Sequence, residues 1–127
     1  MLYKLSKTSY DNMSGIHPDL VKVVEAAITI THVDFAITEG LRTVDRESAM
    51  VAEGKPQTMH SRHLTGHAVD VAAIVDGTVS WEEKYYSQIA NAMLGASASL
   101  KIPLIWGGSW RTLKDLCHFE LNRKFYP

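Results

Sequence analysis

The architecture of this chain can be worked out from one segment, Ser61-Arg62-His63-Leu64-Thr65-Gly66-His67-Ala68-Val69-Asp70. It places an imidazole, His63, and a carboxylate, Asp70, seven residues apart with Gly66 between them. The adjoining residues Ala68–Val75 are apolar and rich in valine, which predicts a largely buried strand that contains Asp70. An unpaired buried charge is very costly, so Asp70 needs a partner. A metal ion or a plain hydrogen bond to His63 would supply one, and zinc accepts mixed imidazole and carboxylate ligands.

A second set of polar residues lies near the C-terminus, in His118-Phe119-Glu120-Leu121. Alternation along a strand puts His118 and Glu120 on one face and the two apolar residues on the other. His118 is therefore the best third metal ligand, and Asp115 precedes it by three residues at the end of a loop. Two histidines and one aspartate would leave an open coordination position beside a carboxylate base. Such a site can activate water and polarise a carbonyl group for hydrolysis.

The remaining hydrophobic pattern predicts an α+β fold, a small antiparallel sheet packed against about three helices, in a single domain over residues 1–127. The expected helices open near Pro18, span Asp45–Glu53 before a break at Gly54-Lys55-Pro56, and follow a capping box at Ser80-Trp81-Glu82-Glu83. The expected strands are Asp34–Thr38, Ala68–Val75, Thr78-Val79 after a turn at Asp76-Gly77, Ile102–Trp106 and His118–Leu121. The core-facing residues are expected to be Leu20, Val23, Val24, Ala27 and Ile28 in the first helix, and Tyr85, Ile89, Ala92, Met93, Ala96 and Leu100 in the last.

Composition narrows the class of protein. The 127 residues are 46% hydrophobic and 21% charged, with a formal net charge of -1, which is typical of a globular domain and argues against nucleic-acid binding. The single cysteine, Cys117, excludes an internal disulfide framework, a Cys-rich zinc ribbon and an iron–sulfur cluster. No stretch approaches the roughly 18 apolar residues of a membrane span, and the amino-terminal residues lack the apolar segment of a secretory signal. We therefore expect a monomer made in the cytoplasm, with no stable membrane association.

Four motifs carry a resemblance to a known family. They are Gly40-x-Arg42-Thr43, Ser61-x-His63-x-x-Gly66-x-Ala68-x-Asp70, Trp106-Gly107-Gly108-Ser109-Trp110 and Asp115-x-x-His118-x-Glu120-Leu121. Together they resemble the D-alanyl-D-alanine carboxypeptidase-type (LAS) zinc metallopeptidases. Their order and spacing are most similar to the single-domain phage endolysins that are L-alanyl-D-glutamate endopeptidases.

The resemblance implies a role for each matched residue. It implies Zn²⁺ held by His63, Asp70 and His118, with Asp115 as the catalytic base. It also implies that Arg42 stabilises the oxyanion or holds a substrate carboxylate. It makes Ser61 a contact to the ligands or the substrate. From the residues themselves, Glu120 is either an acceptor for a ligand imidazole or an exposed strand residue. Of Trp106 and Trp110, which flank two glycines, one is expected in the core and the other at the substrate cleft. The implied substrate is the peptidoglycan stem peptide, which an endolysin reaches from the host cytoplasm through a separate membrane pore.

Two other functions stay open from the sequence. A D,D-carboxypeptidase or dipeptidase that trims terminal D-alanine would need a free substrate carboxylate, with Arg42 pairing to it. A catalytically inactive, zinc-containing module for wall binding or structure would have no use for Asp115. Cys117 offers a thiolate that could compete for metal, but its neighbour His118 points to the opposite strand face, which argues against a cysteine protease. His60 and His67 flank the motif and are expected at the surface or the rim.

Overall fold

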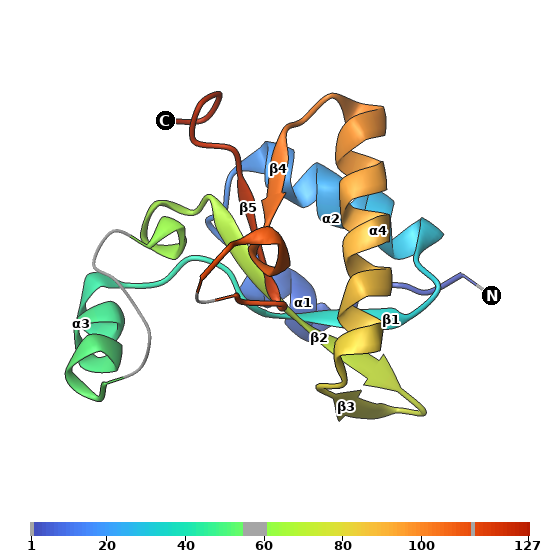
Figure 1. Ribbon diagram of the computed structural model, residues 1–127, viewed down its shortest axis with the longest axis horizontal. Helices are drawn as coiled ribbons and strands as arrows, with labels where there is room; N and C mark the ends of the chain where they lie inside the picture. The colour runs from blue at the N-terminus through green and yellow to red at the C-terminus, as the bar shows by residue number, and fades with distance from the viewer. Residues whose placement is uncertain (1, 55–60, 113) are drawn as a thin grey trace.

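The computed structural model describes residues 2–54, 61–112 and 114–127 (Figure 1). The expected break at Lys55-Pro56 and the expected rim residue His60 lie outside these residues. The helices are α1 (Lys7–Asn12), α2 (Pro18–Ile30), α3 (Val44–Ala52) and α4 (Glu83–Leu100), with short 3₁₀ turns η1 (Arg62–Thr65) and η2 (Gly107–Ser109). The strands are β1 (Asp34–Glu39), β2 (Ala68–Val75), β3 (Thr78–Ser80), β4 (Leu104–Trp106) and β5 (His118–Leu121). The predicted α+β class is confirmed.

The five strands form one antiparallel sheet in the order β1-β2-β5-β4, with β3 paired to β2. Helices α2 and α4 lie together, α4 packs against β2 and β4, and α1 lies against β1 (Figure 1). The hydrophobic core includes alternate strand residues Val69, Val71, Ala73, Phe119 and Leu121. The residues between them in sequence, Asp70, His118 and Glu120, therefore lie on the opposite face of the sheet.

Local sequence explains the elements that frame this face. Pro18 begins α2, and the Nδ1 atom of His17 accepts a hydrogen bond from the backbone N–H of Asp19 at 3.0 Å. The whole predicted core face of α2 is buried. Asp76 and Gly77 both have positive φ, 53° and 76°, as a two-residue hairpin turn between β2 and β3 requires.

The structure corrects three expectations for α4. The helix begins at Glu83 rather than after a capping box, because Ser80 belongs to β3 and its hydroxyl accepts a hydrogen bond from the N–H of Glu82. Tyr86 rather than Tyr85 enters the core, where its hydroxyl donates to the carbonyl of Ser80 at 2.8 Å and accepts from the N–H of Ala73 at 3.1 Å. Leu100 is 41% exposed because it ends the helix beyond the sheet.

Helix α1 is an element that the pattern did not predict. Its sequence, Lys-Thr-Ser-Tyr-Asp-Asn, has no apolar periodicity. It is held instead by polar contacts to β1: the Ser9 hydroxyl accepts from the N–H of Ile37 at 3.0 Å, and the Asn12 amide donates to the Ile37 carbonyl at 2.9 Å. Within the described residues, no helix has the length and apolarity needed to cross a bilayer.

Candidate active site

The 3₁₀ turn η1 positions His63 immediately before β2. The Ser61 hydroxyl caps this turn by accepting a hydrogen bond from the His63 N–H at 3.2 Å. Gly66 ends the turn with a φ of +75°, and a Cβ there would lie 2.8 Å from the carbonyl oxygen of Gly15. Only glycine fits both the conformation and the space. Ser61 and Gly66 therefore place the imidazole rather than react.

A backbone carbonyl fixes the orientation of the His63 ring. Its Nδ1 atom lies 2.8 Å from the carbonyl oxygen of Gly40, which can only accept, so Nδ1 carries the proton. The Nε2 atom then faces Asp70, 3.2 Å from Oδ1. Gly40 is itself tightly held, because a Cβ on it would collide with the carbonyl of Asn12 in α1. The unpredicted helix α1 thus supports the position of His63.

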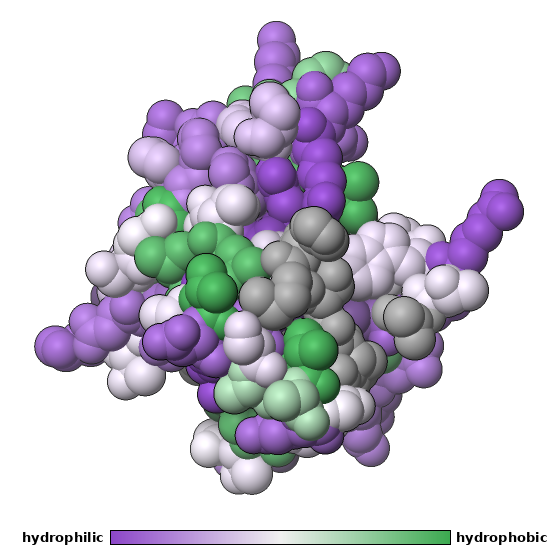
Figure 2. Space-filling model, turned by 90° about the vertical axis from the view of Figure 1, so that its left-hand side faces the viewer, coloured by the Kyte–Doolittle hydropathy of each residue, from purple (hydrophilic) through white to green (hydrophobic). Residues whose placement is uncertain are grey.

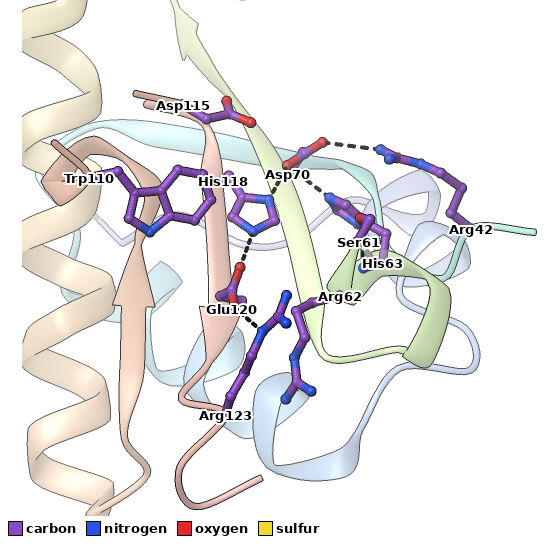
Figure 3. Close-up of a pocket in the computed structure, with 10 residues that line it drawn as sticks. All are labelled: Arg42, Ser61, Arg62, His63, Asp70, Trp110, Asp115, His118, Glu120 and Arg123. Atoms are coloured by element: carbon purple, nitrogen blue, oxygen red, sulfur yellow. Dashed lines mark hydrogen bonds and ion pairs between the residues drawn. The ribbon is translucent and has the colours of Figure 1, made fainter. Parts of the chain in front are cut away.

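The register of β2 and β5 brings the other two predicted ligands together. Asp70 and His118 are direct cross-strand partners, and the Nδ1 atom of His118 lies 3.2 Å from the same Oδ1 atom of Asp70. On the far side of the ring, His118 Nε2 donates to Glu120 Oε1 at 2.8 Å. The expected contact between Glu120 and a candidate ligand imidazole is thus present (Figure 3).

These contacts make a donor set that suits a metal ion. The ligand atoms of His63, Asp70 and His118 lie within 4.8 Å of one another. Each imidazole turns one nitrogen to Asp70 and gives the other to an oxygen acceptor, which is the usual arrangement around a metal-bound histidine. The geometry therefore describes a possible metal site at these three residues.

A second group of possible ligands shares Asp70 and adds Asp115 and Cys117. Burial raises the pKa of the Cys117 thiol, and the nearby carboxylates of Asp70 and Asp115 raise it further. A thiol must lose its proton to bind a metal, so this group is the poorer site. The Sγ atom of Cys117 instead donates a hydrogen bond to Asp115 Oδ1 at 3.1 Å.

The electrostatics of the two central residues are coupled. Burial by itself would raise the pKa of Asp70, but hydrogen bonds from His118 and His63 outweigh it and hold the pKa well below its usual range. Burial would lower the pKa of His118, but hydrogen bonds to Asp70 and Glu120 outweigh it and raise the pKa to about 9. In the metal-free centre, His118 is therefore protonated and positively charged at neutral pH.

A cavity of about 310 Å³ opens over this centre (Figure 3). Its lining residues are Arg42, Ser61, Arg62, His63, Asp70, Trp110, Asp115, His118, Glu120 and Arg123. Of the predicted site residues, Trp106 is the one that does not line it. Its ring stacks on Phe119, and its indole N–H donates to the carbonyl of Leu116 at 2.8 Å. Trp110, by contrast, lies 5.2 Å from the His118 ring, between ring centroids. Trp106 therefore packs against the core, and Trp110 lines the cavity.

Two lining residues, Arg62 and Arg123, were not predicted. Arg62 is adjacent to His63, but no motif or spacing in the sequence indicates a role for it. Arg123 follows β5 in the only adjacent basic pair of the chain, Arg123-Lys124. No periodicity indicates that the Arg123 side chain lines the cavity.

Asp115 precedes β5 and lines the cavity. One of its carboxylate oxygens lies within 4.8 Å of a carboxylate oxygen of Asp70. Its backbone is fixed by hydrogen bonds from its own N–H to Gly107 and from the His118 N–H to its carbonyl, both 3.2 Å long. The carboxylate therefore lies beside Asp70 at the wall of the cavity.

Arg42 lines the cavity, yet most of its side chain is buried among carboxylates of the protein. Its Nε and Nη2 atoms form a bidentate pair with Glu39 at 2.7 and 2.8 Å, and Nη1 donates to the fully buried Glu47 at 2.7 Å. Its Nη2 atom also lies 3.8 Å from Asp70 Oδ2. This network, Glu39–Arg42–Glu47, supports the side of Asp70 that faces away from the imidazoles.

Comparison with known proteins identifies the family. Residues 1–127 match the family model of the phage L-alanyl-D-glutamate peptidases. The chain belongs to this family. The predicted resemblance to these peptidases is confirmed.

Individual relatives agree with that assignment. The L-alanyl-D-glutamate peptidase of Escherichia phage T5 is 30% identical over 130 residues, covering 99% of this chain and 94% of its own length. The peptidoglycan L-alanyl-D-glutamate endopeptidase CwlK of Bacillus subtilis is 28% identical, over 85% of this chain and 74% of its own. The crystal structure of the Serratia marcescens L-Ala D-Glu endopeptidase ChiX superposes with a TM-score of 0.92 at 48% identity, covering 98% of this chain and 94% of that one. The predicted fold is thus also found in a solved peptidase of the same named activity.

Proposed function

We propose that this chain is a zinc-dependent endopeptidase that hydrolyses the L-alanyl-D-glutamate bond of the peptidoglycan stem peptide. One observation carries the proposal: the half-buried carboxylate of Asp70 has an imidazole nitrogen 3.2 Å away on each side and lines an open cavity. Membership of the phage L-alanyl-D-glutamate peptidase family supports the choice of bond.

The donor set supports zinc. Two imidazole nitrogens and one carboxylate oxygen form a three-ligand set that leaves room for water in a tetrahedral site. His63 would bind through Nε2 and His118 through Nδ1, since their other nitrogens are engaged by Gly40 and Glu120. When bound, zinc supplies Lewis acidity, which makes water a better nucleophile and a carbonyl a better electrophile.

The chain's own residues supply proton transfer and orientation. We assign Asp115 as the base that accepts a proton from the attacking water and delivers it to the nitrogen of the leaving amine. Trp110 provides an aromatic wall beside His118 that excludes water from one side. Arg42 acts as a positioning residue, because its Glu39 and Glu47 partners hold it beside Asp70.

The contacts of Arg42 also weigh against the carboxypeptidase alternative. That activity needs a guanidinium that pairs with the terminal carboxylate of the substrate. In this structure Arg42 is 4% exposed and already pairs with two carboxylates. The inactive-module alternative leaves the position of Asp115 at the cavity wall without a purpose.

We further propose that the protein acts on the cell wall as a monomer, after release through a membrane pore formed by another protein. The phage origin of the relatives and their peptidase names support this site of action. Sedimentation of the purified protein tests the monomer, and lysis that depends on a co-expressed pore tests the route.

The central experiment incubates the purified protein with peptidoglycan, with and without a chelator, and identifies the products by mass spectrometry. New amino termini on D-glutamate that disappear with chelator and return with zinc are the expected result. Released D-alanine would replace the proposal with the carboxypeptidase. A zinc-loaded protein that cleaves nothing would replace it with the binding module.

A further inference from the structure

Acidic and basic side chains lie at different ends of the cavity. Asp115 and Asp70 lie at one end, and the two arginines that the sequence did not predict, Arg62 and Arg123, lie at the other (Figure 3). Glu120 is the carboxylate between them and His118. The two guanidinium groups against this one carboxylate leave an excess of positive charge at the second end.

Arg123 is the more accessible of the two arginines. It lies two residues after β5, and its Nε atom is 3.7 Å from Glu120 Oε2. Its side chain is 57% exposed, and in Figure 3 the guanidinium rises beside Glu120 toward the centre of the site. A solute in the cavity can therefore contact this group while it also lies near His118.

Arg62 adds a second positive charge behind the first. Its residue is 7% exposed, its Nη2 atom donates to the carbonyl of Tyr126, and its buried Nε atom has no hydrogen-bond partner. Arg62 forms no ion pair with any carboxylate among the described residues. The guanidinium groups of Arg62 and Arg123 line the same cavity, so their like charges repel each other. An added anion here would relieve that repulsion.

The proposed substrate carries a suitable anion. A glutamyl residue within a peptide uses one carboxyl group for the amide that continues the chain, and the other carboxyl group stays ionised. In the L-alanyl-D-glutamate bond this residue supplies the leaving nitrogen, so its carboxylate lies only a few bonds from the bond that breaks. Guanidinium is the side-chain group best matched to a carboxylate.

We propose that Arg123, with Arg62 behind it, forms a subsite that binds the free carboxylate of the D-glutamyl residue. This inference rests on the proposed function and adds the reason for its preference for an acidic residue after the scissile bond. Arg42 has no part in this subsite, because its guanidinium pairs with Glu39 and Glu47.

The test compares two synthetic stem peptides that differ only in this group, one with the free D-glutamyl carboxylate and one with that carboxylate amidated. The zinc-loaded wild type is expected to cleave the acid with a kcat/KM roughly tenfold or more above that of the amide. Arg123→Gln should bring this ratio close to one by slowing only the acid. Lys124→Gln removes the neighbouring exposed charge, which does not line the cavity, and should leave the ratio unchanged.

A binding measurement gives a readout apart from turnover. Calorimetric titration of the metal-free proteins with the product peptide that begins with D-glutamate should show weaker binding for Arg123→Gln than for the wild type and Lys124→Gln. Equal cleavage of acid and amide by the wild type would overturn the subsite while leaving the endopeptidase intact. Equal slowing of both peptides by Arg123→Gln would also overturn it, because the guanidinium would then act only by bracing Glu120. Failure of the zinc-loaded wild type to cleave either peptide would overturn the proposed function itself.

Discussion

The proton held by His118 predicts how zinc affinity depends on pH. In the metal-free protein the two carboxylates of Asp70 and Glu120 raise the pKa of His118 to about 9. A histidine must be neutral at the coordinating nitrogen to bind a metal, so this proton has to leave when zinc enters. Zinc affinity is therefore expected to rise with pH through the neutral range.

The size of the effect follows from the pKa. At pH 7 the group is two units below about 9, so the proton lowers the apparent affinity by about 100-fold, or about 2.7 kcal/mol at 1.36 kcal/mol per unit. Raising the pH from 7 to 8 should increase the affinity by about tenfold through His118 alone. Titrations of the metal-free protein by calorimetry, in buffers of different ionisation enthalpy, should also detect the release of about one proton from this residue.

The variant Glu120→Gln provides the control. The amide keeps the size of the side chain and an acceptor oxygen but removes one of the two carboxylates that raise the pKa of His118. The rise in affinity between pH 7 and 8 should become shallower. A wild-type affinity that is flat over this range, in protein that stays folded, would refute the reasoning. If zinc affinity rises equally with pH in Glu120→Gln and in the wild type, Glu120 does not raise the pKa of His118.

Three further predictions concern catalysis and stability. Asp115→Asn should keep zinc, measured by metal analysis, but lower kcat by about 10²–10⁴-fold; loss of the metal would make Asp115 a ligand instead. Tyr86→Phe leaves the Ser80 carbonyl and the Ala73 N–H without their buried partner, so urea unfolding should show a loss of about 1–3 kcal/mol, and an unchanged midpoint would contradict this. In the metal-free protein, the raised pKa of His118 contributes stability that is fully present below about pH 6.5 and is lost as the pH rises through about 9. Unfolding curves should therefore show the free energy of unfolding fall by up to about 3 kcal/mol over this range. Bound zinc should abolish this pH dependence.

Local pattern was enough to predict the two strands that carry the candidate ligands Asp70 and His118. Strand β2 has the predicted bounds Ala68–Val75, because a valine-rich run ends at a strong turn signal. Strand β5 alternates as expected, with Phe119 and Leu121 in the core and His118 on the other face. Both predictions use only neighbouring residues, which is why they succeed.

Contacts between distant segments could not be predicted in the same way. Helix α1 is stabilised by hydrogen bonds to β1 rather than by its own periodicity. Arg42 lines the cavity, but no sequence pattern indicates its buried ion pair with Glu47 on the next helix. The basic end of the cavity depends on Arg62 and Arg123, which are far apart in sequence and meet only in the folded chain. In each case the residues come into contact only in the folded chain, so no local sequence pattern indicates the contact.

The pairing of Asp70 with His118 across β2 and β5 also bears on how such a protein can change over time. These residues are 48 positions apart, yet a slip of one residue would turn His118 toward the core and Phe119 toward the cavity. Insertions or deletions within β5 should therefore abolish the hydrophobic core and the reaction centre together, with no half-functional intermediate. Variation can enter through the connections on either side, which carry Trp110 and Arg123. Relatives with the same pairing of β2 and β5 are then expected to differ in the residues that line the cleft, and with them in the cell walls that they accept.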